Sequence, residues 1–175
     1  MMNPIKTYDY LIQSRERVFD AVRPLTSEQW AHKFKFGLIT IGSTLTHNMT
    51  SEWYYFERFT GKAVRSYDEW PIQYETPPSF AVVEATWRPQ QSRVRSFVAS
   101  ERDWNRRVEY DTFADDAGKR YHIAATSGDI LTQLALHEVH HRSQIMAMLR
   151  ELGGSVKPLQ DIDYNDLMYE RHELA

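Results

Sequence analysis

The chain of 175 residues contains no cysteine. Disulfide bonds, thiolate metal ligands and cysteine nucleophiles are therefore excluded, and any metal ion must be held by histidine or carboxylate. Glycine and proline are also scarce, with seven of each. Because these two residues interrupt regular structure most strongly, their scarcity favours long, continuous helices.

An excess of charge of one sign is missing as well. Lysine and arginine number 21 against 24 aspartate and glutamate, so the net charge is −3. Nucleic-acid-binding domains normally carry a basic excess. No apolar run approaches the roughly 18 residues of a membrane helix, and no signal peptide is visible. We therefore expect a cytoplasmic protein of one domain, residues 1–175, that binds neither nucleic acid nor membranes.

Four long segments carry apolar residues at helical spacing. They cover approximately residues 5–22, 42–59, 79–102 and 126–152, and Pro89 lies inside the third. Before the fourth segment, residues 108–112 and 120–124 alternate in polarity around a turn at 116–118, which predicts a hairpin. The tail, 158–175, has room for one short helix. These patterns predict an all-α four-helix bundle with a small β-hairpin before the last long helix.

Two histidines occupy one face of the fourth segment. His137 and His141 are four residues apart, which places them about 40° apart around a helix, one turn above the other. Apolar residues such as Leu134 and Ile145 share this sector, so both imidazoles should face the interior. One interpretation is a pair of core histidines satisfied by hydrogen bonds. A cation is the alternative, because it satisfies both imidazoles at once.

The same residues spell the H-E-x-x-H pattern of zinc proteases, His137-Glu138-Val139-His140-His141. In such enzymes Glu138 would act as general base on a metal-activated water. The extended form of the motif requires glycine and histidine where this chain has Gln144 and Ala147. A metalloprotease is therefore one alternative.

Several motifs together resemble a known family. They are Thr46-His47, the run Glu52-Trp53-Tyr54-Tyr55-Phe56 with Gly61 after it, the run from His137 to Ile145, and Leu149-Arg150-Glu151-Leu152-Gly153. In order and spacing the chain resembles the DinB-like family of bacterial four-helix-bundle metalloproteins, sometimes grouped with the YfiT-like metal-dependent hydrolases. Ser143 stands where the family most often has glycine.

The resemblance implies a divalent-metal site of three histidines. His47 would join His137 and His141, although periodicity alone does not select His47. The resemblance also implies a homodimer. Family relatives include thiol-dependent S-transferases and a thiol-dependent isomerase, which use low-molecular-weight bacterial thiols.

Three neutral imidazoles leave coordination positions open and the full +2 charge on the metal, which favours an anion such as hydroxide or thiolate. Imidazole ligands suit zinc, our default, with nickel next. Two further residues are candidates to orient the ligand imidazoles by hydrogen bonds: Gln144, about 20° from His137 around the helix, and Glu138. We expect a metal-dependent enzyme of thiol S-transferase or hydrolase type. The alternative from a different class is a non-catalytic, metal-binding stress-response dimer.

Overall fold

The computed structural model describes residues 3–114 and 117–170. These residues are predominantly helical, with one small antiparallel hairpin. The long helices are α1 (Pro4–Val22), α3 (Ile41–Phe59), α4 (Phe80–Ser100) and α5 (Ser127–Leu152). The short elements are α2 (Ser27–Trp30), the 3₁₀ turn η1 (Tyr67–Glu69), the strands β1 (Arg107–Asp111) and β2 (His122–Thr126), and α6 (Tyr164–Met168).

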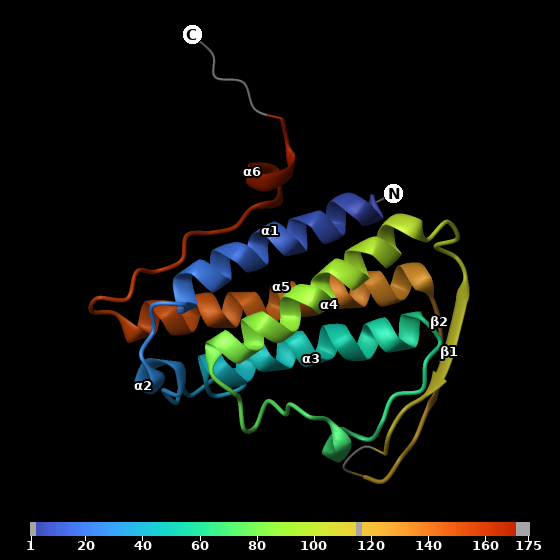
Figure 1. Ribbon diagram of the computed structural model, residues 1–175, viewed down its shortest axis with the longest axis horizontal. Helices are drawn as coiled ribbons and strands as arrows, with labels where there is room; N and C mark the ends of the chain where they lie inside the picture. Colours follow the sequence, from blue (N-terminus) through green and yellow to red (C-terminus); the bar gives the residue numbers. More distant parts are fainter. Residues whose placement is uncertain (1–2, 115–116, 171–175) are drawn as a thin grey trace.

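The long helices lie lengthwise beside one another (Figure 1). Helix α1 packs on α4 and α5, and α3 packs on the same two helices. The hairpin lies at one end of this assembly, and α6 packs against the outer side of α1 (Figure 1). Within the described ranges, no helix has the length and apolarity that crossing a bilayer requires.

Side-chain caps explain where the helices begin. The Thr40 side chain accepts a hydrogen bond from the backbone N–H of Ser43 at the start of α3. Thr126 and Asp129 form a capping box at the start of α5, where each side chain accepts from the other's backbone N–H. Such caps satisfy N–H groups that have no partner within the helix. They confirm the predicted start of α5 at residues 126–127.

The predicted hairpin is present, but β1 begins one residue earlier and β2 two residues later than the predicted strands. Arg107 pairs with Thr126 and Asp111 with His122, so β2 begins two residues later than the predicted strand at 120–124. The reason is that pairing continues into the start of α5, where the N–H of Ser127 donates to the carbonyl of Arg106 at 2.9 Å. Alternation of polarity does not reveal this continuation. Asp116, in the predicted turn, lies outside the described residues.

The hydrophobic core is divided into two clusters along the helix axes. One contains Val18, Phe19, Ile41, Leu45, Met49, Trp87, Ile145, Met148 and Leu149. The other contains Tyr8, Leu11, Phe56, Phe59, Val94, Val98, Ile130, Leu131 and Leu134. On each long helix, buried polar residues lie between the residues of the two clusters: Arg15 on α1, Glu52 on α3, Gln90 on α4 and Glu138 on α5. A buried polar layer therefore crosses the middle of the protein.

Arg15 is the centre of this polar layer. Its side chain is 1% exposed and lies 2.6 Å from a carboxylate oxygen of Glu52 on α3 and 2.7 Å from one of Glu138 on α5. Glu52 also accepts from the indole N–H of Trp87 at 2.8 Å and from the Gln90 amide at 3.0 Å, both on α4. The layer thus joins all four long helices through hydrogen bonds to charged groups, which are stronger than neutral ones.

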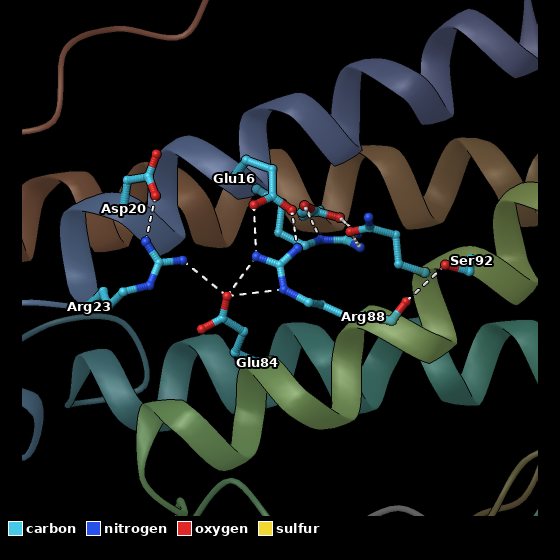
Figure 2. Close-up of polar contacts among 9 residues, drawn as sticks. Glu16, Asp20, Arg23, Glu84, Arg88 and Ser92 are labelled. Atoms are coloured by element: carbon cyan, nitrogen blue, oxygen red, sulfur yellow. Dashed lines mark hydrogen bonds and ion pairs between the residues drawn. The ribbon is translucent and has the colours of Figure 1, made fainter.

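The surface arginines of α4 are mostly paired. Figure 2 shows Arg88 between Glu16 on α1 and Glu84, with Arg23 bonded to the same Glu84. Arg95 pairs with Asp9 at 3.0 Å. These exposed ion pairs lie at the α1–α4 contact, and each contributes little to stability because solvent screens it.

We predict that Arg15→Met lowers the free energy of unfolding by about 3–5 kcal/mol, because two buried carboxylates lose their cation. The matched control is Arg95→Met, which breaks an exposed pair and should cost less than about 1 kcal/mol. Urea denaturation of both variants measures the difference. Equal losses in the two variants would show that the polar layer does not stabilise the fold.

Candidate metal centre

Three histidines from two helices come together beside the polar layer. His47 lies on α3, and His137 and His141 lie on α5. The ring nitrogens they offer all lie within 4.8 Å of one another, and Nε2 of His47 is 3.0 Å from Nε2 of His137. His141 is buried, whereas His47 and His137 are half-buried. The cluster therefore lies at the edge of the α3–α5 contact, with one side open to solvent.

The local structure explains this convergence. His137 and His141 are one turn apart on α5, so their rings lie edge to face along the helix with centroids 4.5 Å apart. Helix α3 packs closely on α5 and brings the His47 ring within 4.8–4.9 Å of both. The structure thus brings together all three residues that the family resemblance selected.

The donor set and its spacing fit a divalent cation. Zinc lies about 2.0–2.1 Å from imidazole nitrogen, so tetrahedral ligands are about 3.4 Å apart. The Nε2 atoms of His47 and His137, 3.0 Å apart, are near this spacing, and all three donor nitrogens lie within 4.8 Å of one another. Among the residues that the structure describes, no carboxylate and no fourth histidine belongs to the cluster. Structural zinc sites are normally closed by four protein ligands, so three histidines match the open, catalytic type.

The imidazoles are held in the neutral form that binds metal. Burial, together with a smaller contribution from the nearby His141, lowers the pKa of His47 to about 4. Burial also lowers the pKa of His137 to about 3, together with the charges of His141 and His47. The pKa of His141 falls because of burial, which outweighs its hydrogen bond to Gln144. At neutral pH all three rings are therefore uncharged.

Gln144 orients one of these rings. Its Oε1 lies 2.9 Å from Nδ1 of His141, and its Nε2 lies 3.0 Å from Nε2 of His140. When Nδ1–H of His141 donates to Gln144, the lone pair of Nε2 is left for a metal ion. The amide packs closely against Gly37, where only glycine leaves room for it, because a Cβ at this position would lie 3.0 Å from Oε1 of Gln144. His140 itself is exposed and outside the cluster.

Glu138 lies on a different side of α5 from the two histidines. Its oxygens accept from Nε of Arg15 at 3.2 Å and from Nη2 at 2.7 Å. Burial raises the pKa of the Glu138 carboxyl, and Arg15 opposes this effect. The carboxylate is thus committed to the polar layer and faces α1.

The loop between α3 and α4 covers one side of the cluster. The ring of Tyr74 lies edge-on to His47 with centroids 4.9 Å apart, and Tyr67 donates a hydrogen bond to Glu75 beside it. Burial acts to raise the pKa of Glu75, but hydrogen bonds from Tyr67 and Tyr74 outweigh it and lower the value. Sequence analysis missed these residues, because nothing in a loop sequence indicates which helix it covers. Ser51, whose Oγ lies 3.5 Å from Nε2 of His47, could have been found from its i+4 spacing.

A comparison with models of known protein families identifies the family of this chain. The model of the DinB family matches residues 1–172. The chain belongs to the DinB family. No curated protein matches the chain.

The lowered pKa values predict how metal binding by this DinB-family protein depends on pH. Because His47 and His137 titrate near 4 and 3, protons compete with metal only well below neutrality. We expect the affinity for zinc to stay constant from pH 8 to about pH 6 and to fall below about pH 5. Competition with a chromogenic chelator at each pH measures this. A steady fall beginning near pH 7, as for ordinary histidines with pKa about 6.5, would contradict it.

Proposed function

We propose that this protein is a metal-dependent enzyme whose divalent cation, zinc or nickel, is held by His47, His137 and His141. The observation that carries the proposal is the open donor set: three neutral imidazole nitrogens within 4.8 Å, without a fourth protein ligand in the described ranges. When bound, a divalent cation supplies Lewis acidity, which lowers the pKa of a water or thiol in an open position.

The residues of the chain would supply binding and orientation. Gln144 holds the His141 ring by its hydrogen bond at 2.9 Å, and Tyr74 packs against His47. Tyr55 lies near His137 with ring centroids 6.4 Å apart. These tyrosines make one wall of the site aromatic and restrict the access of water. A substrate therefore approaches from the open side between α3 and α5.

We propose thiol transfer as the specific reaction, and hydrolysis as the second candidate reaction of a metal-dependent enzyme. The DinB family match supports it, together with the neutral charge of the ligand set, which favours an anionic thiolate over a neutral ligand. The co-substrate would be a low-molecular-weight thiol.

Two finer structural proposals accompany this function. We infer that the long helices form a four-helix bundle of the DinB type, since α1 and α3 each pack on both α4 and α5. We also propose a homodimer, for which the exposed Leu136 and Val139 on α5 offer apolar surface; their exposed fractions are 64% and 37%. Trp53 and Tyr54 of α3 pack on Trp70 within the chain, so they offer less surface to a second copy.

The metalloprotease alternative is not favoured by the geometry. A general base must reach the water that it deprotonates. Both oxygens of Glu138 instead accept hydrogen bonds from Arg15 in the buried layer. A role for Glu138 as base would require this ion pair to break.

Metal analysis tests the site itself. Protein purified without a histidine tag should contain about one equivalent of divalent metal, and His47→Ala should lose most of it, because two imidazoles hold a cation much less tightly than three. His122→Ala, which removes an exposed hairpin histidine, is the matched control and should keep the metal. Metal retained in the His47 variant would remove α3 from the site, and metal-free wild type would remove the site altogether.

Turnover tests the enzyme class. Metal-loaded protein should accelerate the reaction of cysteine or glutathione with 1-chloro-2,4-dinitrobenzene, followed by absorbance. His141→Ala should return the rate to that of the uncatalysed reaction, because the cation is lost. If the metal-loaded wild type gives no rate above the variant, thiol transfer to this electrophile is wrong. A full metal content without any turnover would instead support the non-catalytic, metal-binding alternative.

A further inference from the structure

A second concave site lies on the other side of α3. A cleft with a volume of about 390 Å³ is formed by α3, α4 and the loop that carries η1. Its α3 residues Met49 and Trp53 are rotated by about 160° and 120° from His47 around the helix. The cleft is therefore separate from the histidine cluster and falls in the size range of small-molecule pockets.

The cleft has a fixed polar floor and aromatic walls. Gln90 lies at the floor, 4% exposed, and its Nε2 donates to the Met49 carbonyl at 2.9 Å and to Glu52 at 3.0 Å. Trp53 from α3 and Trp70 from the loop pack edge to face, with centroids 4.9 Å apart. Both indoles are half-buried, so part of each ring is left for a ligand.

Two arginines at this cleft lack acidic partners. Arg65 from the loop and Arg93 from α4 line it, and neither has an ion pair within residues 3–114 and 117–170. The neighbouring arginines of α4 behave differently, since Arg88 and Arg95 each bind carboxylates. Glu69 is the acidic residue of the lining, which leaves a net charge of +1.

We propose that this cleft binds a small aromatic anion, a carboxylate or sulfonate. Its ring would pack against Trp53 and Trp70, and its anionic group would bind Arg65 and Arg93. Guanidinium groups suit planar, bidentate contact with such oxyanions, and indole faces add apolar area. A ligand of this class would use both features of the cleft, because its ring would be buried against the indoles while its charge would meet the two guanidinium groups.

Calorimetric titration with naphthalene-2-sulfonate tests this inference. We expect one equivalent to bind, both to the protein as purified and after treatment with a chelator, because the cleft does not include the histidines. The cation 2-naphthylmethylammonium should not compete. Failure of the sulfonate to bind, or equal binding of the ammonium, would overturn the proposal. Binding lost on chelation would place the anion on the metal and would equally overturn it.

Three variants locate the bound anion. Arg65→Gln and Arg93→Gln should each weaken binding about tenfold, the value of one charge-assisted hydrogen bond. Arg102→Gln is the matched control, because Arg102 carries the same charge just beyond the end of α4, where its side chain donates to the Ala99 carbonyl outside the cleft. Circular dichroism checks that each variant is folded. Equal affinities in all three variants would show that the anion binds elsewhere. This outcome is independent of the metal content, so it does not depend on the proposed enzyme function.

Discussion

The buried cation Arg15 constrains the middle of this protein. Removing a charge from water is costly, and the cost is offset only when partners of opposite charge and further hydrogen bonds surround it. Arg15 therefore requires Glu52 from α3 and Glu138 from α5 at fixed positions. Glu52 in turn binds Trp87 and Gln90 of α4. Apolar contacts alone would let the helices slide or rotate relative to one another. The hydrogen bonds of this layer are satisfied in one register of the four helices.

The histidine cluster depends on that register. Glu138 is adjacent to His137 in the sequence, and its hydrogen bonds to Arg15 fix the rotation of α5 about its axis. With that rotation set, His137 and His141 face α3, where His47 lies five residues before Glu52. The H-E-x-x-H pattern thus has a structural explanation in this chain: the glutamate points about 80° away from the mean direction of the two histidines around the helix and serves a different contact. Glu138 stands between the two histidines in the sequence, but its side chain belongs to the polar layer and theirs belong to the histidine cluster.

Periodicity predicted the long helices well, because each buries one apolar face. Gly61 and Gly153, with φ of 73° and 56°, follow α3 and α5. The pair on α5 also followed from spacing alone. His47 did not, since its contact with α5 depends on how two distant helices pack. Arg15 was equally hidden, because it lies in the charged run Arg15-Glu16-Arg17, which is typical of a solvated surface. The loop residues Tyr67, Tyr74 and Glu75 have no periodicity from which a position could be predicted.

The loop between α3 and α4 contacts both sides of α3. At Tyr74 it packs on His47, and at Trp70 it packs on Trp53 in the cleft. One segment thus shapes the entrance to the neutral histidine cluster and the wall of a cationic cleft. Both sites rest on the same buried layer, through Glu138 on one side and through Gln90 on the other. Sequence changes in this loop can therefore alter either site without disturbing the charges that hold the helices together, because the hydrogen bonds of the layer, among the residues that the structure describes, come from the long helices.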